Sequence, residues 1–275
     1  MSREVLLVVG LSGYAGDALR RNSVYSRWAV VGASRRTGLD ITDRAAVVSR
    51  FASVRPAAVI NVAAALGNAG GPAQASWPVN VRGAAHVAAA AAVVGARLVH
   101  VSSDAVHAGR PEPYTEADDP SPVFPYGAAK AAAEAAVSAV CPDAVLARTS
   151  LIVSDGVAPL SRHEQTALAM TRGEAPGALF VDEIRCPVPV GGLAAALLAL
   201  AGSDLTGVVN VAGLTPMSRH ELGIRTALRN GLDPSRVPAG KLSDSALTRP
   251  AKIHLDSGYL LSHFPDLEPH LTLPR

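Results

Sequence analysis

The sequence is short of cysteine, of lysine and of long apolar runs, and these shortages exclude several classes of protein. Cys141 and Cys186 are its two cysteines, and their isolation excludes a disulfide scaffold and offers no metal-ligand spacing, so we expect buried thiols. The longest apolar runs, 84–96 and 193–201, are shorter than the roughly 20 residues that a membrane-spanning helix needs. We therefore expect no membrane partner.

Charge and the N-terminal sequence narrow the location and the partners. Residues 1–4 run directly into an apolar segment, which leaves no room for a signal peptide and predicts a cytoplasmic protein. The formal net charge is +2 without a dense basic run, so nothing indicates nucleic acid. With 49% hydrophobic residues, the chain can form one large α/β domain, and the expected partner is a small-molecule substrate.

Apolar runs of strand length alternate with Ala-rich segments of helix length over the first 150 residues. Such alternation is typical of βαβ units, and runs that are apolar on both faces suit a covered parallel sheet. We predict an α/β, doubly wound Rossmann fold with a mainly parallel sheet in residues 1–150, and a smaller substrate-binding region in 151–275 interleaved with it. The predicted strands are 5–9, 28–33, 57–61, 97–102, 144–148 and 207–212. The predicted helices are 14–22, 43–54, 77–95, 126–140, 162–172, 191–201 and 218–230, and 233–275 is predicted to be irregular.

A glycine-rich turn follows the first predicted strand, where Gly10, Gly13 and Gly16 are spaced as in a dinucleotide-binding loop. Glycines let the backbone approach a pyrophosphate closely, and the helix that follows points its N-terminus at the phosphates. We expect Ser12 and Tyr14, within the same turn, to contact the cofactor as well.

The end of the second predicted strand selects the cofactor. A carboxylate there binds the ribose 2′-hydroxyl of NAD, whereas arginines accommodate the 2′-phosphate of NADP. This chain has Ser34, Arg35 and Arg36 at that place and no acidic residue before Asp40. The pattern predicts NADP(H), with Ser34 as a hydrogen-bond donor. The alternative is that both arginines are only exposed turn residues.

Two further segments are candidates for the rest of the cofactor. Asp40 and Ile41 could hold the adenine, although Thr42 or Asp43 could equally cap the next helix. The end of the third predicted strand offers small side chains, which leave room for a cofactor but are also ordinary in tight packing. The candidates there are Asn61, Ala63, Ala64 and Ala65.

The fourth predicted strand ends in hydroxyl-bearing residues, at the sheet edge where ligands bind in open α/β folds. Reduction of a carbonyl needs a hydride donor, a proton donor and a group that orients the carbonyl. Tyr126 can donate the proton and Ser103 can orient the carbonyl, with Ser102 as the alternative. Lys130, one of only three lysines, lies four residues after Tyr126 on the same helical face. We expect Lys130 to hold the nicotinamide ribose and to lower the pKa of Tyr126.

These motifs resemble the extended short-chain dehydrogenase/reductase family, and within it the dTDP-4-dehydrorhamnose reductase branch. The resemblance is close over the first 150 residues and loose beyond them. It rests on residues 10–16, 39–43, 59–61, 79–80, 95–104, 113–116, 126–130 with Glu134, 148–150, and the later pairs 249–250 and 255–256. It implies a catalytic set of Ser103, Tyr126 and Lys130, with serine where the family more often has threonine. It also implies that Asn80 lies at the cofactor.

Departures from the family pattern concern the substrate and a metal. Residues 104–107 read Asp-Ala-Val-His where the family has Asp-Tyr-Val-Phe, and residues 151–154 lack the usual aromatic, so we expect a different ketone, such as a modified nucleotide sugar. A glutamate linked to metal in some members falls at Ala18, so no metal is predicted. Three arginines could meet a diphosphate or simply form surface ion pairs: Arg148, Arg185 and Arg249. The candidates for substrate binding are Ser102, Asp104, His107 and Arg249.

The sequence thus predicts an NADPH-dependent reductase of a ketone on a nucleotide-linked 4-keto sugar. One alternative is a nucleotide-sugar epimerase or dehydratase that retains its cofactor. Another is a non-catalytic, NADP-binding regulatory subunit, similar to the β subunit of methionine adenosyltransferase. A homodimer through the Ala-rich faces of 77–95 and 126–140 is also expected, although packing within one subunit would explain those faces equally well.

Overall fold

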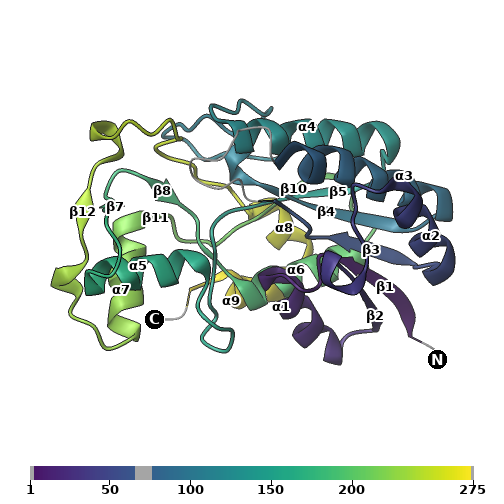
Figure 1. The fold of residues 1–275 in the computed structure, drawn as a ribbon, viewed down its shortest axis with the longest axis horizontal. Coiled ribbons are helices and arrows are strands. Elements are labelled where there is room, and N and C mark those ends of the chain that lie inside the picture. The colour runs from purple at the N-terminus through teal and green to yellow at the C-terminus, as the bar shows by residue number, and fades with distance from the viewer. Residues whose placement is uncertain (1–2, 66–75, 274–275) are drawn as a thin grey trace.

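The fold is seen in a computed structural model that describes residues 3–65 and 76–273 (Figure 1). Its centre is a six-stranded sheet in the order β10-β5-β4-β3-β1-β2, and every pair of neighbours is parallel. The strands are β1 (Glu4–Val9), β2 (Trp28–Ala33), β3 (Ala58–Asn61), β4 (Arg97–Ser103), β5 (Val145–Thr149) and β10 (Gly207–Val211). All six strands were predicted within one residue at either end, and the doubly wound parallel sheet is confirmed.

Helices cover both faces of this sheet, as the strand sequences require. Leu6 and Val8 of β1 pack into one apolar cluster, whereas Leu7 and Val9 pack into the other. Successive side chains of a strand point to opposite faces, so a strand that is apolar throughout must be covered twice. The first cluster lies under α1 (Tyr14–Asn22) and α6 (Val190–Ala201), and the second under α2 (Arg44–Val54), α3 (Ala84–Val94) and α4 (Pro125–Val140).

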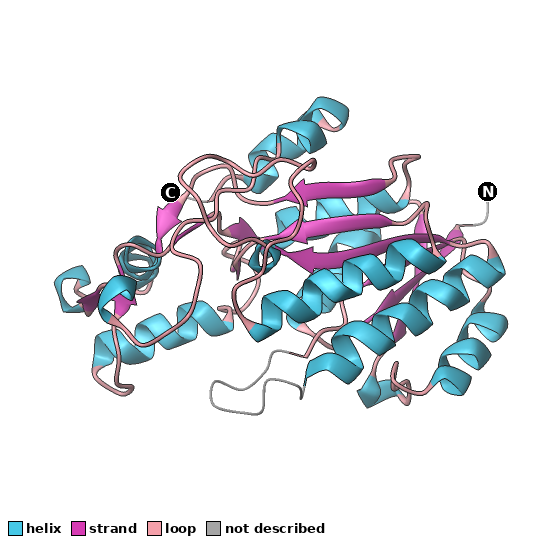
Figure 2. Ribbon diagram, turned by 90° about the horizontal axis from the view of Figure 1, so that it is seen from above, coloured by secondary structure: helices cyan, strands magenta, loops and turns pink. Residues whose placement is uncertain are grey.

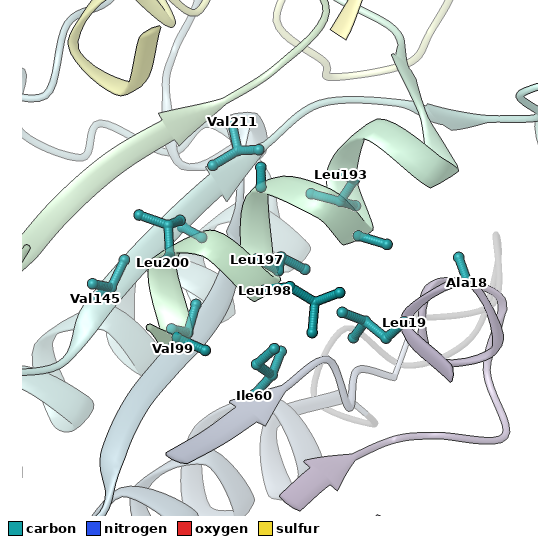
Figure 3. Packing of buried hydrophobic residues seen from close by; sticks show 14 of the residues in the cluster. Ala18, Leu19, Ile60, Val99, Val145, Leu193, Leu197, Leu198, Leu200 and Val211 are labelled. Carbon is teal, nitrogen blue, oxygen red and sulfur yellow. The ribbon is translucent and has the colours of Figure 1, made fainter. Parts of the chain in front are cut away.

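Helix α6 fills the first face. Its Leu193, Leu197 and Leu200 lie among side chains of the strands and of α1, as Figure 3 shows. The α6 sequence is apolar on every side, which fits a helix enclosed between the sheet, α1 and the C-terminal helices.

Local signals explain the helix ends. Asp43 caps α2 by accepting a hydrogen bond from the backbone N–H of Ala46, which settles the choice between Thr42 and Asp43. Gly95 ends α3 in the left-handed conformation, with φ of +69°. The predicted helix 77–95 differs in its first turns, because Pro78–Gly83 is π-helical before α3 begins.

The chain after β5 builds a second lobe and also returns to the sheet. Figures 1 and 2 show this lobe beside the sheet, with α5 (Arg162–Arg172) and α7 (Arg219–Arg229) packed together. Three two-stranded pairings within it were not predicted: β6 (Ile152–Val153) with β9 (Val188–Pro189), β7 (Leu179–Phe180) with β12 (Ala239–Gly240), and β8 (Ile184–Arg185) with β11 (Met217–Ser218). Between them, α6 and β10 rejoin the main sheet, so the two parts of the chain interleave.

The last segment is more regular than predicted. It contains α8 (Gly258–His263) and α9 (Glu268–Leu271), which pack near β10 and α6. Single turns of 3-10 helix occupy Ser23–Tyr25, Arg35–Thr37, Asp104–Val106, Pro234–Arg236, Leu242–Asp244 and Pro265–Leu267. Within the described residues, no helix has both the length and the apolar character to cross a membrane.

We predict that Leu197→Ala lowers the free energy of unfolding by about 2–5 kcal/mol, because the side chain is fully buried between α6 and the sheet. Urea denaturation followed by circular dichroism would measure the loss. The matched control is Leu228→Ala on α7, whose side chain is 57% exposed. A change at Leu228 as large as that at Leu197 would contradict the described packing.

Candidate functional site

The glycine-rich turn between β1 and α1 is a tight cradle. Gly10 has a φ of +96°, and a Cβ on it would lie 2.8 Å from the backbone nitrogen of Ala63. A Cβ on Gly16 would lie 2.4 Å from the carbonyl oxygen of Gly10. Only glycine fits both positions. Gly13 precedes α1 without a side-chain cap, so the first N–H groups of the helix remain available to an anion.

A cavity of about 380 Å³ opens above this turn, at the carboxyl ends of β1, β2 and β3. β1 lies between β2 and β3 in the sheet, so the connections from β1 lead first to one side of the sheet and then to the other. Ligands bind at such a switch point in doubly wound folds. The cavity gathers most of the predicted cofactor residues: Gly10, Ser12, Gly13, Ser34, Arg35, Arg36, Asp40, Ile41, Ala63, Ala64 and Ala65. It also has four apolar lining residues that were not predicted, which are Val9, Leu39, Val62 and Val79.

The polar rim of the cavity is ordered by short hydrogen bonds. The Ser12 hydroxyl donates to that of Ser34 at 2.5 Å, and Ser34 and Thr37 cap the 3-10 turn that carries Arg35. Arg35 is 78% exposed, and its Nε lies 3.6 Å from Asp40. Asp40 also accepts hydrogen bonds from the backbone and hydroxyl of Thr42, which lower its carboxyl pKa. Its carboxylate is therefore already engaged by its neighbours.

Four of the predicted cofactor residues do not line the cavity: Tyr14, Gly16, Asn61 and Asn80. The Tyr14 hydroxyl donates to the carbonyl of Pro159 at 2.8 Å, so its side chain points toward the second lobe. Asn61 accepts from the N–H of Ala63 at 3.1 Å and contacts His100, and Asn80 bonds both the N–H and the carbonyl of Ala65. Gly16 lies beneath the turn. These contacts fix the small residues that form one wall.

Ser103 and Tyr126 meet at the carboxyl end of β4. Ser103 is the last residue of β4 and Tyr126 the second of α4. A Cβ on Gly127 would lie 2.1 Å from the carbonyl oxygen of Ala105, so glycine lets α4 approach the end of β4. Burial and then the Asp104 carboxylate raise the pKa of Tyr126 to about 12, and a hydrogen bond with Ser103 partly opposes the rise.

Lys130 lies one turn after Tyr126 and is enclosed. Its Nζ donates to the carbonyl of Val101 at 2.7 Å, and burial lowers its pKa to about 8, with Glu134 opposing the shift. We expected Lys130 to lower the pKa of Tyr126, but Lys130 is not among the groups that shift this pKa. Asp104 is the charged group that acts on Tyr126, and it raises that pKa.

Ser102 and Ser103 face opposite sides of β4. Ser102 is 2% exposed and donates to Glu134, which also forms a two-pronged ion pair with Arg148 at 3.1 and 2.9 Å. Arg148 further donates to the carbonyl of Asp118 at 2.8 Å. Of the two serines, Ser103 is the one beside Tyr126. Arg148 is enclosed, so the suggestion that it meets a diphosphate is wrong.

Two other substrate candidates, Asp104 and His107, are buried. Asp104 is buried beside Tyr126 and accepts a hydrogen bond from Ser150 at 2.7 Å. His107 is fully buried and stacks on Tyr114 with ring centroids 4.0 Å apart, so it is not a solvated loop residue. Burial and then Arg148 lower the pKa of His107 to about 4.

Two arginines of the second lobe, Arg185 and Arg249, differ in their exposure to solvent. Arg185 is enclosed, with Glu183 at 3.3 Å and Asp104 at 3.8 Å, and donates to the carbonyls of Ile184 and Pro250, so it too has no place for a diphosphate. Arg249 is exposed, on the segment that runs beside β8.

Ser150 belongs to one of the motifs of the resemblance but was given no role, and Glu183 was not singled out from the sequence. Their importance follows from which strands lie side by side, and no motif carries that information. Cys141 and Cys186 are both buried, as expected. Among residues 3–65 and 76–273, no three His, Cys, Asp or Glu side chains gather as metal ligands would.

The parallel sheet, its helices on both faces and the glycine turn at the central crevice define a Rossmann-type α/β protein. A family model described as the RmlD substrate binding domain matches residues 4–266. The chain therefore belongs to the RmlD substrate-binding domain family. This confirms the resemblance that the motifs indicated.

Individual relatives agree with this assignment. The dTDP-4-dehydrorhamnose reductase of Streptomyces griseus is 36% identical over 257 residues, which cover 89% of this chain and 82% of that protein. The reductase of the same name from Mycobacterium tuberculosis strain H37Rv is 34% identical over 166 residues; the match spans 58% of this chain and about half, 53%, of that relative.

The fold matches that of the dTDP-4-dehydrorhamnose reductase of Bacillus anthracis, whose crystal structure is a complex with NADP. The TM-score is 0.84 with 24% sequence identity, over 97% of this chain and 98% of that one.

We predict that Asp104→Asn lowers the pKa of Tyr126 from about 12, because one of the two causes that raise it is removed, while burial keeps it above 10. Ultraviolet titration of tyrosinate, as the difference from the matching Tyr126→Phe protein, would measure it. A tyrosine with a raised pKa keeps its proton longer when folded, so its stabilising contribution is lost as pH rises from 10 toward 12. Equal titration of Asp104→Asn and the exposed control Asp119→Asn would contradict the assignment.

Proposed function

We propose that this protein reduces a ketone with NADPH, and that the ketone is carried by a nucleotide-linked 4-keto sugar. The observation that carries the proposal is the meeting of the Ser103 and Tyr126 hydroxyls at the carboxyl end of β4, with Lys130 one helical turn away. NADPH, when bound, supplies the hydride that adds to the carbonyl carbon. Side chains of the protein then orient the carbonyl oxygen and donate a proton to it.

Each of these side chains has a distinct part in the proposed reaction. Tyr126 holds its proton at neutral pH, because its pKa is raised to about 12, and donates it to the oxygen as negative charge develops there. Ser103 orients the carbonyl by donating a hydrogen bond to the same oxygen. In this proposal Lys130, whose Nζ donates a hydrogen bond to the carbonyl of Val101, binds the nicotinamide ribose.

The cofactor assignment is supported by the rim of the crevice. Ser12, Ser34, Arg35 and Arg36 line it together, and no carboxylate closes β2 where NAD would need one. The N-terminus of α1 and the glycine turn offer backbone N–H groups to the pyrophosphate. The similar Bacillus anthracis protein carries NADP.

The substrate class is supported by the relatives and by Asp104. Proteins named for reduction of dTDP-4-dehydrorhamnose match most of this chain, and Asp104 is placed beside Tyr126, where it can accept a hydrogen bond from a sugar hydroxyl. The departures at 104–107 and 151–154 are the reason for proposing a ketone other than dTDP-4-dehydrorhamnose.

The same proposal includes a homodimer. Helix α3 has no charged residue, and the two charged residues of α4, Lys130 and Glu134, are both buried. The outward faces of these two helices therefore offer alanine and valine, with Val93 85% exposed. Such an uncharged face suits a second copy of the chain.

The deciding experiment follows NADPH absorbance with a panel of nucleotide-linked 4-keto sugars. We predict turnover by the wild type and a fall in kcat of about a hundredfold or more in Tyr126→Phe, with NADPH binding retained. Tyr259→Phe is the matched control, because Tyr259 is 42% exposed and lies in α8, outside the residues that line the crevice.

Two outcomes would count against this function. Undiminished turnover in Tyr126→Phe would remove the tyrosine from the reaction. If NADPH binds but is not consumed with any of the substrates in the panel, the result would favour an epimerase or dehydratase that retains its cofactor, or a regulatory subunit.

For the cofactor, we predict that the double change Arg35→Gln and Arg36→Gln weakens NADPH binding by about tenfold or more, since charge-assisted hydrogen bonds to the 2′-phosphate are lost. NADH binding should stay within about twofold. Fluorescence titration of both cofactors would measure this. The exposed Arg20→Gln is the control, and an equal effect on NADH would argue against 2′-phosphate recognition.

A further inference from the structure

Three chain segments bring basic residues together in the second lobe. Strand β8, which ends at Arg185, pairs antiparallel with β11, and Arg219 follows β11 directly. On its other side, Ile184 of β8 bonds the backbone of 251–253, just after Arg249. Figure 1 shows β8 and β11 together, with α5 and α7 close by. The small sheet therefore sets several arginines in one neighbourhood, although their sequence positions are far apart.

Among these arginines, Arg185 is the one that forms salt bridges within the described residues. Arg185 takes both nearby carboxylates, Glu183 at 3.3 Å and Asp104 at 3.8 Å. Arg219, Arg249 and Arg162, the last at the start of α5, have no carboxylate within salt-bridge distance in the described part of the chain. The carboxylates of Glu183 and Asp104 act on Arg219 through their charge, but neither is within salt-bridge distance of it. Arginines held together without directly paired carboxylates favour the binding of an anion.

Arg219 is also incompletely hydrogen-bonded. Its Nη2 donates to Nδ1 of His163 at 3.2 Å, whereas its Nη1 is closed off from solvent and lacks a hydrogen-bond partner among the residues described. Desolvation acts strongly on this guanidinium and lowers its pKa. A buried guanidinium N–H without an acceptor is costly, and an oxyanion would remove that cost.

His163 acts on the orientation of Arg219. Its Nδ1 accepts the hydrogen bond from Arg219, which requires that the ring be neutral. Burial, and then Arg219, Arg162 and Arg249, lower the pKa of His163 to about 4, so the ring is neutral at physiological pH. The imidazole thus fixes one side of the guanidinium and adds no charge to the cluster.

We propose that Arg219 is an anion-binding residue of the second lobe, that His163 positions it, and that it receives a phosphoryl group of the substrate. The cluster lies near Tyr126, because the charge of Asp104 acts on both Tyr126 and Arg219, and Asp104 lies 3.8 Å from Arg185. The phosphoryl class rests on the proposed function, in which the sugar carries a nucleotide diphosphate. The anion site itself rests on the geometry of this lobe.

Inorganic pyrophosphate is the probe, and NADP⁺ is kept saturating so that the glycine turn is not available to it. Calorimetry should show pyrophosphate binding to the wild type and binding weakened by about ten- to a hundredfold in Arg219→Gln, as expected for loss of a charge-assisted hydrogen bond. Arg225→Gln is the matched control on the same helix, because Arg225 pairs only with the exposed Glu221. In kinetics, Arg219→Gln should raise KM by a similar factor and change kcat by less than about threefold.

His163 is tested by the same two readouts. His163→Leu should weaken pyrophosphate binding and raise KM, whereas His163→Asn, which can still accept a hydrogen bond near the Nδ1 position, should restore most of both. NADPH affinity, unchanged in every variant, would show that the fold is intact. A merely structural histidine would give equal losses in Leu and Asn and would affect NADPH binding as well.

The results separate this inference from the proposed function. If the wild type fails to bind pyrophosphate, or Arg219→Gln binds it as well as Arg225→Gln does, the anion site is overturned even when a ketone is reduced. If Arg219→Gln loses pyrophosphate binding while the wild type reduces no ketone, the anion site stands and the reductase proposal falls.

Discussion

The buried ion pair of Arg148 with Glu134 holds the reacting end of this protein in place. It joins β5 to α4, ties both to β4 through Ser102, and reaches the 107–118 loop through the carbonyl of Asp118. Both side chains are at most 5% exposed, so removal of either would leave a buried charge, at a cost of about 3–5 kcal/mol. Since α4 carries Tyr126 and Lys130, the rotation of this helix is fixed by a contact that takes no part in the proposed chemistry.

Much of the fold could be predicted from the sequence because its strands are apolar on both faces. A run such as Val5 to Val9 is typical of a strand that is buried on both faces of a sheet. The glycine turn marks the end of this first strand. The two-residue strands of the second lobe were missed for a matching reason. A pair such as Ile184 and Arg185 is too short for periodicity to register, and it becomes a strand only because Met217 and Ser218 lie beside it.

The candidate site shows the same division. Residues that line the crevice from one continuous turn or strand end could be predicted, whereas the environment of each polar side chain could not. Ser102 and Ser103 are adjacent and chemically alike, and only the direction in which each leaves β4 distinguishes them. The sequence allowed Arg148 a surface ion pair and His107 a contact with substrate, and it did not indicate that both side chains are buried. Arg219 gave no sequence signal, because the lack of a hydrogen-bond partner for its Nη1 among the described residues depends on how the chain folds around it.

The return of α6 and β10 to the main sheet limits how the molecule can move. Tyr14 at the glycine turn bonds Pro159, and α6 supplies leucines to the core under β3, β4 and β5. A hinge just after β5 would have to pull this helix out of the core, which the burial of Leu193, Leu197 and Leu200 opposes. The interleaving therefore favours a fixed mutual orientation of the two lobes over a hinge motion between them.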